Sequence, residues 1–520
     1  MITKVFWKRT YLFFEYDSED AEEIALCSKE SGRKVVMHSK ELGPGKQRAK
    51  LNIAIAEGRE MLDEGMWSVI NEHEETIRIS DEVMFGIEDI SRVFRYSQDI
   101  FAYTVTFELN GDDPENIGIR MNVAYMQKNA HKKKQRGKIR LIRMLVNIYY
   151  QIIVRLSPNK GNRVLFMSDN MDHIRDNMLA IDRRIRERGL DSEFKVSYHF
   201  RNIFGKKQSC FDWIRAVNAI AKNDIIFVDD YVPVFSLINL YKTKLIQTWH
   251  AGFGFKLVGY ARFGIGGSPH PFVSCHRKYD YALVGNDHLR EIYSEVFGIE
   301  EEALLSTGMP RLDHFLDREH MHRCRRALYE KYGMLLGRKV ILFAPTYRGL
   351  NQKSAYYDYD KIDRDRLYKW CKENNFSVLF KMHHFIEEPF PVKAEHRDLF
   401  IDVAQEQINE LFYISDILIT DYSSCFYDYL LLGQPVLFFV YDKAYYSATR
   451  GVHRPIDSVA PGKICRDFDE LMTALQNEDY GKTEAKEMLI DKCRTSDLFA
   501  SDKVIDFVLL GKEVPGICKK

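Results

Sequence analysis

The sequence contains little cysteine and no hydrophobic run long enough to cross a bilayer. Nine cysteines are scattered over 520 residues, their number is odd, and no two of them form a CxxC pair. Disulfide frameworks and structural zinc sites usually show cysteines paired at short spacings, so this pattern is typical of a reduced, intracellular protein. The opening segment MITKVFWKRTYLFFEYD breaks its apolar run with charges, which argues against a signal peptide. We therefore expect a cytoplasmic protein.

The chain also lacks an excess of charge of either sign. Lysine plus arginine number 75, and aspartate plus glutamate number 75. A balanced chain has no global field that attracts nucleic acid, so we expect no nucleic-acid partner. Any electrostatic preference must come from local clusters of charge, and composition does not fix the oligomeric state.

Several signatures of catalytic chemistry are missing. GxSxG, HExxH and Walker-type sequences do not occur, which argues against hydrolase and ATPase functions. No DxD pair has the character of a metal ligand set, and Asp229 with Asp230 is more simply explained as a turn cap after a strand. The sequence therefore predicts no cofactor and no metal site, and it leaves metal dependence open.

Residues 1–128 alternate apolar and polar side chains over short runs that are separated by turn segments such as ELNGDDPENIG. A period of two with such turns predicts a small antiparallel β-sandwich. No paired catalytic groups stand out there. We interpret this region as an accessory domain for acceptor binding, assembly or spacing from a surface.

We predict a basic linker helix over residues 129–160. Residues 116–168 contain no acidic side chain, and the segment KKKQRGKIRLIRMLVNIYYQIIVRL mixes cations with aliphatic residues. Such a helix could lie in the interface of an anionic membrane, where each cation near the surface contributes roughly 1 kcal/mol. It could equally be a linker helix that packs between domains. The sequence leaves both interpretations open.

From residue 161 onward, buried-type strands alternate with helical segments in two series. RVLFMSDN, DIIFVDD and KLIQTWHA belong to the first, and KVILFAPTYRG, SVLFKMHHF and DILITDYSS belong to the second. This alternation predicts parallel sheets covered by helices on both faces. We expect two Rossmann-like domains, residues 161–335 and 336–520 with the C-terminal helices, which face a cleft.

His250 follows a strand and enters a glycine-rich loop that contains Gly252, Gly254 and Lys256. An imidazole at the end of a parallel strand is well placed for the site, and its ordinary titration range suits proton transfer. The glycines allow a close approach of the backbone to a ligand, and the lysine could meet an anion. This loop predicts a general base with an anion-binding neighbour.

The second series carries hydroxyls and cations after its strands. Ser423 and Ser424 precede a helix, where hydroxyls and free N–H groups can bind an anion, although either serine could serve only as an N-cap. Four cationic or imidazole side chains could line a diphosphate if they converge. These are Arg348, Lys381, His383 and Arg450.

Five motifs in this order resemble the CDP-glycerol glycerophosphotransferases, which build teichoic-acid-type polyol phosphate polymers. The motifs are QTWHAGFGFK, STGMPRLDHFL, FAPTYRG, FKMHHF and ISDILITDYSSCFYDYLLLGQPVLFFVYD. The resemblance implies a GT-B fold, CDP-glycerol as the donor, a lipid-linked or polymeric acceptor, and release of CMP.

The resemblance also implies roles for individual residues. His250 would activate the acceptor hydroxyl, and His383 with Lys381 would contact the donor phosphates. Further donor contacts are implied for Arg348, Thr420, Ser423, Ser424, Asp428 and Arg450, and cleft positions for Arg311 and Asp313. The loop WHAGFGFK places its lysine six residues after the histidine, where many members have five, so the acceptor stays open.

Three alternatives remain beside a CDP-glycerol transferase. The donor could be CDP-ribitol, because nothing in the sequence measures the length of a polyol. A nucleotide-sugar glycosyltransferase or a related epimerase could use the same fold. A membrane-associated binding protein with a vestigial site would keep donor binding without turnover.

Overall fold

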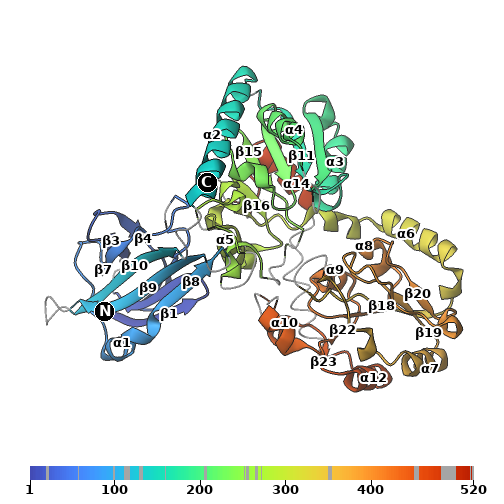
Figure 1. The fold of residues 1–520 in the computed structure, drawn as a ribbon. Helices are drawn as coiled ribbons and strands as arrows, with labels where there is room; N and C mark the ends of the chain where they lie inside the picture. Colours follow the sequence, from blue (N-terminus) through green and yellow to red (C-terminus); the bar gives the residue numbers. More distant parts are fainter. Residues whose placement is uncertain are drawn as a thin grey trace.

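The computed structural model contains three sheet-bearing units (Figure 1). It describes residues 1–18, 23–56, 58–97, 100–110, 117–127, 133–158, 160–203, 208–250, 252, 257–263, 268–270, 272–349, 354–449, 452, 456–481, 499–515 and 517. The predicted Gly254, Lys256 and Arg450 lie outside the described residues.

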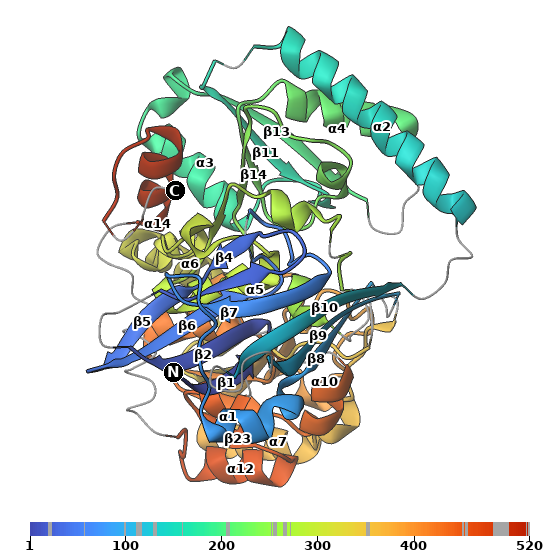
Figure 2. The ribbon, with the colours of Figure 1, turned by 90° about the vertical axis from the view of Figure 1, so that its left-hand side faces the viewer.

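The first unit is the predicted β-sandwich, made of two antiparallel sheets (Figure 2). Along β9 every second residue from Phe101 to Phe107 is buried, as expected for a strand with one face in the core. The first sheet has the order β1 (Ile2–Lys8), β2 (Tyr11–Asp17), β6 (Lys46–Asn52), β5 (His38–Gly43). The second has the order β4 (Lys34–Val36), β3 (Ala25–Ser28), β7 (Gly65–Ile70), β10 (Gly118–Gln127), β9 (Phe101–Asn110), β8 (Arg92–Tyr96), and α1 (Asp81–Gly86) adjoins β1.

A long helix, α2 (Lys133–Leu156), leads from the sandwich to the second unit and lies beside α4 (Cys210–Ala221) in both views (Figures 1 and 2). The hydroxyl of Tyr149 donates a hydrogen bond to Asn218 of α4 at 3.0 Å, and Tyr150 is fully buried. The opposite side of α2 leaves several large apolar side chains exposed. Among the described residues, no helix combines the length and the apolar character that a membrane span requires.

The second unit is an α/β domain whose sheet is parallel except at its β12 edge. Its strand order is β12 (Asn170–Met171), β13 (Lys195–Asn202), β11 (Arg163–Ser168), β14 (Ile225–Val228), β15 (Lys244–Gln247), β16 (Tyr281–Leu283), β17 (Leu304–Leu305). The helices α3 (Asp176–Glu187), α4 and α5 (Arg290–Phe297) belong to this unit, and α6 (Arg318–Lys331) leads to the third. The strand order reverses between β11 and β14, which is where ligands bind in open parallel sheets.

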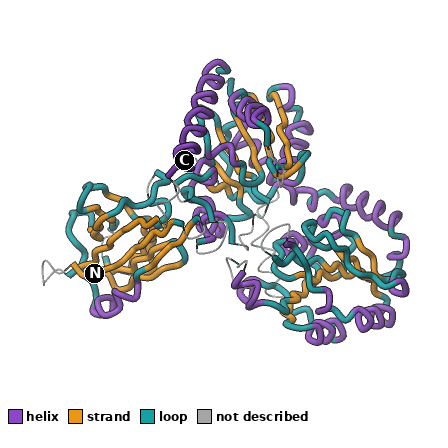
Figure 3. Tube along the Cα trace, viewed as in Figure 1, coloured by secondary structure: helices purple, strands orange, loops and turns teal. Residues whose placement is uncertain are grey.

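The third unit is a fully parallel sheet between helices (Figure 3). Its strand order is β20 (Phe400–Asp402), β19 (Phe376–Phe380), β18 (Lys339–Phe343), β21 (Ile417–Thr420), β22 (Val436–Phe439), β23 (Lys463–Cys465). Its helices are α7 (Arg364–Asn374), α8 (Ile408–Phe412), α9 (Cys425–Tyr429), α10 (Lys443–Thr449), α11 (Ile456–Val459) and α12 (Phe468–Gln476). The reversal between β18 and β21 marks its ligand crevice.

The C-terminal segment returns to the second unit, which corrects the prediction that residues 336–520 form one domain. Helix α14 (Ala500–Val504) continues as a π-helical turn, Ile505–Leu509. Its apolar residues Val504 and Ile505 join the core that contains Phe166 of β11. An apolar run fits either sheet equally well, so the sequence alone could not decide between them.

Candidate active site

His250 stands just beyond the carboxyl end of β15, on a turn whose backbone is held from several sides. The Thr248 N–H donates to the Val228 carbonyl at 2.7 Å, and the Trp249 N–H donates to Oε1 of Gln247 at 2.9 Å. Trp249 is buried, whereas His250 is exposed, and their ring centroids are 4.6 Å apart. The buried indole of Trp249 therefore fixes the turn, and the imidazole of His250 faces solvent.

Gly252, two residues after His250, approaches the segment that joins the two α/β units. A Cβ atom on Gly252 would lie 2.0 Å from the sulfur of Met309, so no other residue fits there without displacing that methionine. The Gly252 carbonyl also accepts a hydrogen bond from the Gly285 N–H at 3.1 Å. We predicted that Gly252 makes room for a ligand, whereas the structure shows that it makes room for Met309.

The β-sandwich packs on the segment that follows this loop. Tyr260 is fully buried within the sandwich core, and the ring of Phe263 meets that of Phe94 with centroids 5.3 Å apart. The guanidinium of Arg9 donates to the Ala261 carbonyl at 2.6 Å. The β-sandwich is therefore in direct contact with the chain that leads away from His250.

Arg348 lies too deep to contact a donor phosphate, contrary to the sequence-based prediction. Its side chain is 2% exposed, and its guanidinium donates to Asp421 at 2.5 Å and to both oxygens of Asp442 at 2.7 and 2.8 Å. Rings of Tyr422 and Tyr446 lie over it, with centroids at 5.5 Å. Two carboxylates neutralise this cation, so it organises the polypeptide behind the site.

His383 and Lys381 follow β19, but they point to different neighbours. The Phe385 N–H donates to Nδ1 of His383 at 3.2 Å, so the proton of the neutral ring is on Nε2, which can donate to an anion. Nζ of Lys381 donates to the Ala404 carbonyl at 2.5 Å, and burial lowers the pKa of this lysine. Backbone groups therefore engage both Nδ1 of His383 and Nζ of Lys381.

The TDYSS segment contributes fewer free groups than predicted. The Thr420 hydroxyl is buried and donates to the Ala344 carbonyl at 2.7 Å, which corrects its prediction as a donor ligand. Ser423 accepts a hydrogen bond from the Cys425 N–H at 3.4 Å, while the hydroxyl of Ser424, the N-cap residue of α9, makes no capping bond. Both serines are partly exposed, so they remain the groups of this segment that a ligand can reach.

Asp428 and Arg311 do not serve two separate ligands, as predicted, but pair with each other. Both oxygens of the Asp428 carboxylate accept hydrogen bonds from the Arg311 guanidinium, one of them at 3.0 Å. Their side chains are only 4% and 12% exposed, respectively. This ion pair joins the segment η9 (Pro310–Phe315) to the start of α9 in the third unit.

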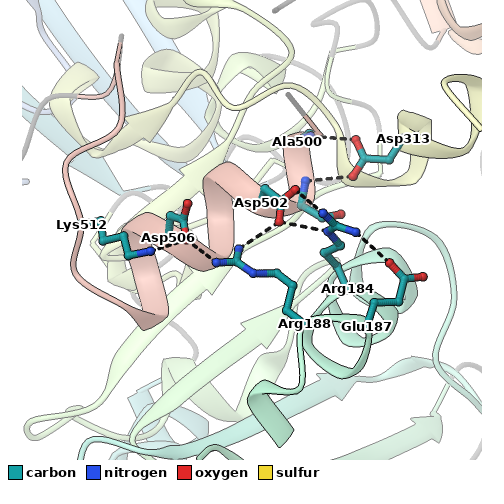
Figure 4. Close-up of polar contacts among 9 residues, drawn as sticks. Arg184, Glu187, Arg188, Asp313, Ala500, Asp502, Asp506 and Lys512 are labelled. Atoms are coloured by element: carbon teal, nitrogen blue, oxygen red, sulfur yellow. Dashed lines mark hydrogen bonds and ion pairs between the residues drawn. The ribbon is translucent and has the colours of Figure 1, made fainter. Parts of the chain in front are cut away.

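Asp313 caps the returning C-terminal helix (Figure 4) and also lines a cavity at the junction of the two α/β units. Its two oxygens accept the N–H groups of Ala500 at 2.7 Å and Ser501 at 2.9 Å. Burial raises the pKa of Asp313 to about 6, against the lowering effect of those hydrogen bonds. Arg184 of α3 and Arg188, the residue after α3, form ion pairs with Asp502 of the C-terminal helix at 2.8 and 2.9 Å. These contacts explain why the C-terminal segment lies on the second unit.

A cavity of about 760 Å³ opens beside this helix. Arg311 and Asp313 line it, together with residues of α3, of the start of α6 and of α8. The cavity therefore adjoins both α/β units at the point where η9 joins them. In the described part of the chain, no group of three or more His, Cys, Asp or Glu side chains is arranged to hold a metal ion.

Two polar residues near the strand ends have features that the sequence analysis did not predict. Asn177 is 2% exposed and binds the turn before His250. Burial raises the pKa of Asp229 to about 7, and one oxygen of this carboxylate has no hydrogen-bond partner in the described residues. The position of Asp229 directly after β14 was a usable signal, whereas nothing in the sequence distinguishes Asn177 from an ordinary residue at a helix start.

These strand-end motifs coincide with the match to a known family. A protein-family model described as CDP-Glycerol:Poly(glycerophosphate) glycerophosphotransferase matches residues 148–510 of this chain. The chain belongs to this family. The match begins within α2, so it includes both α/β units and excludes the β-sandwich.

Two curated relatives from Staphylococcus aureus (strain NCTC 8325 / PS 47) extend the similarity. Teichoic acid ribitol-phosphate polymerase TarL is 29% identical over 92% of this chain and 93% of its own length. Teichoic acid ribitol-phosphate polymerase TarK is 31% identical over 84% of this chain and 88% of its own. The teichoic acid poly(glycerol phosphate) polymerase of Bacillus subtilis (strain 168) is 25% identical over 76% of this chain.

A solved structure, that of the wall teichoic acid polymerase TagF, shares the fold. It superposes with a TM-score of 0.57 at 22% identity and covers 73% of this chain and 98% of its own. A variant of TagF soaked with CDPG superposes with the same TM-score. The predicted GT-B architecture of two Rossmann-like units is therefore confirmed.

Proposed function

We propose that this protein transfers a polyol phosphate from a CDP-alcohol to a hydroxyl at the end of a polyol-phosphate acceptor and releases CMP. The observation that carries the proposal is the exposed imidazole of His250, fixed on Trp249 beyond β15 in a chain whose two α/β units match the family. A hydroxyl needs a base to take its proton before it can attack phosphorus. The imidazole of His250 can serve as that base.

In the proposed reaction, His250 takes the proton of the acceptor hydroxyl while the hydroxyl oxygen attacks the β-phosphorus of the donor. A bond forms between the acceptor oxygen and the β-phosphorus, and the bond between the β-phosphorus and the oxygen that bridges it to the α-phosphate breaks, so that CMP leaves with that oxygen and the electron pair. Nε2–H of His383 donates to a phosphate oxygen and thereby stabilises the charge that develops. Ser423 and Ser424 add hydroxyl donors, and Lys256 and Arg450 remain predicted cations of this site.

We favour CDP-ribitol as the donor over CDP-glycerol, which the sequence analysis placed first. The two relatives that cover 92% and 84% of the chain are ribitol-phosphate polymerases. The glycerol-phosphate relative from Bacillus subtilis covers 76% of this chain, and the chain spans 56% of that relative. The same comparison supports a polymerase, which adds many units, over a primase.

We also propose that the protein works in the cytoplasm on an anionic membrane face, with α2 as the contact. The outer side of α2 exposes seven large apolar residues, each by more than 40%: Leu141, Ile142, Met144, Leu145, Ile148, Ile152 and Leu156. The helix carries no acidic side chain, so its cations can meet anionic head groups while these residues enter the interface. A lipid-linked acceptor would then be presented where the enzyme binds.

The test is CMP release by the purified protein from CDP-ribitol, CDP-glycerol and a UDP-sugar, each with a lipid-linked polyol-phosphate acceptor. His250→Ala is compared with His288→Ala, a matched control at another exposed histidine of the same unit. We expect release from CDP-ribitol that falls by roughly 10²–10⁴ in His250→Ala and stays unchanged in the control.

Each alternative gives a different result. Preference for CDP-glycerol would keep the chemistry and reverse the donor assignment. Turnover of only the UDP-sugar would replace phosphotransfer with glycosyl transfer. Binding of a CDP-alcohol without any turnover would indicate a vestigial site.

A further inference from the structure

Asn177, the second residue of α3, is buried and makes three hydrogen bonds to segments far away in the chain. Its side-chain nitrogen donates to the carbonyl of Thr248 at 3.0 Å and also to the carbonyl of Trp249. Its side-chain oxygen accepts the N–H of Arg311 at 2.9 Å. These partners are 71, 72 and 134 residues away, so the side chain serves other segments instead of capping its own helix.

The first two bonds hold a strained turn. Trp249 has φ = 47°, in the left-handed region that bulky residues rarely adopt. Such a conformation costs of order 1–3 kcal/mol and persists only where its surroundings fix it, commonly at functional sites. Here Gln247 holds the N–H of Trp249 and Asn177 holds its carbonyl. That carbonyl belongs to the peptide from which His250 begins, so the direction of the imidazole depends on it.

The third bond connects this turn to the donor half. The backbone N–H of Arg311 donates to the Asn177 side chain, and its guanidinium donates to Asp428 of α9. The buried side-chain amide of Asn177 therefore connects the peptide that precedes His250 with the ion pair that joins the two α/β units. The position of His250 and the placement of the third unit share a physical connection.

We propose that Asn177 is a positioning residue for His250, and that it links the orientation of the imidazole to the Arg311–Asp428 pair. The catalytic consequence rests on the proposed function, whereas the orientation itself does not. The two parts can therefore be tested separately.

The informative variant is Asn177→Asp, which keeps an acceptor for the Arg311 N–H but removes both donors and sets a carboxylate against two carbonyls. Asn223→Asp is the matched control. The Asn223 amide likewise donates to a backbone carbonyl, that of Ala219 at 2.7 Å, and its oxygen accepts from Ser197 at 3.1 Å. That site lies at the amino-terminal end of β14, opposite to His250.

The orientation is read from tryptophan fluorescence against pH, because a protonated imidazole in contact with an indole quenches its emission. The difference between the wild type and His250→Gln isolates the quenching of Trp249 by His250. We expect this component to fall at least about twofold in Asn177→Asp and to stay unchanged in Asn223→Asp. This readout needs no substrate, so it decides the orientation even if neither CDP-alcohol is turned over.

The consequence is read from CMP release with whichever CDP-alcohol the wild type uses. We expect kcat to fall by about 10²-fold, as for a reacting group displaced by about 1 Å, with KM for the donor changed less than about threefold. If Asn177→Asp does not fold, Asn177→Ser supplies a neutral variant with the same expected directions. Unchanged quenching and unchanged kcat in a folded Asn177 variant, with only its stability lowered, would overturn the proposal.

Discussion

The guanidinium of Arg311 donates hydrogen bonds to both carboxylate oxygens of Asp428 across the boundary between the two α/β units. Arg311 belongs to the segment that leaves the second unit, and Asp428 lies in the first turn of α9 in the third. Both had been predicted to face substrates. Their pairing instead fixes how the second unit meets the third.

The pair predicts a large coupling between the two positions. Removal of one partner leaves an unpaired buried charge, so Arg311→Met and Asp428→Leu should each lower the free energy of unfolding by about 3–5 kcal/mol. The double variant, with no buried charge, should recover a substantial part of that loss. Urea denaturation of the four proteins measures the coupling, and simple addition of the two single costs would contradict it.

Arg348 should act on stability rather than on donor affinity. Its guanidinium holds Asp421 and Asp442 together inside a shell of tyrosines. Lysine cannot reproduce the fork that binds two carboxylates, so Arg348→Lys should lower the thermal midpoint while KM for the CDP-alcohol changes little. A raised KM at unchanged stability would restore the predicted contact with phosphate.

The arrangement of strands and the position of the strand-end motifs could be predicted from the sequence, because buried runs followed by polar residues are local signals. The partners of those motifs could not. No residue near Arg348 in the sequence indicates that it pairs with Asp421 and Asp442. Likewise, no residue near Asp428 indicates that it pairs with Arg311. Long-range pairs of this kind depend on how sheets are placed relative to one another, which local patterns do not encode.

Asp229 gives the protein a pH-dependent contribution to stability. Burial raises its pKa to about 7 from an ordinary value of 3.8, so the folded state holds the proton more tightly than the unfolded chain. The stability due to this group is complete below pH 3.8 and is lost as the pH rises through about 7. Between pH 5 and pH 8 that loss amounts to about 3 kcal/mol.

Asp229→Asn removes this titration, so the free energy of unfolding of the variant relative to wild type should increase between pH 5 and pH 8. Urea denaturation at the two pH values measures the difference. Asp191→Asn, at an exposed position of the same unit, controls for a general effect of removing one acidic group. A difference between variant and wild type that does not change with pH would show that Asp229 is ionised throughout this range.

Helix α2 should bind anionic vesicles through both charge and apolar contact. Each cation near the surface contributes roughly 1 kcal/mol, so the double variant Arg140→Gln with Arg143→Gln should bind phosphatidylserine vesicles about 30-fold more weakly. Leu145→Gln with Ile148→Gln should also weaken binding, because it removes exposed apolar surface. Lys222→Gln, an exposed cation just beyond α4, should have little effect.

Salt and lipid composition separate the two contributions in this co-sedimentation assay. Electrostatic attraction is screened within a Debye length of about 8 Å at physiological ionic strength, so binding of the wild type should weaken as salt rises. The variant without Arg140 and Arg143 should show a weaker salt dependence than the wild type, because other cations of α2 remain, while the apolar variant should keep the wild-type salt dependence. Equal binding of all variants to phosphatidylserine and to neutral phosphatidylcholine vesicles would reject the membrane contact and leave α2 as a helix that packs on the second unit.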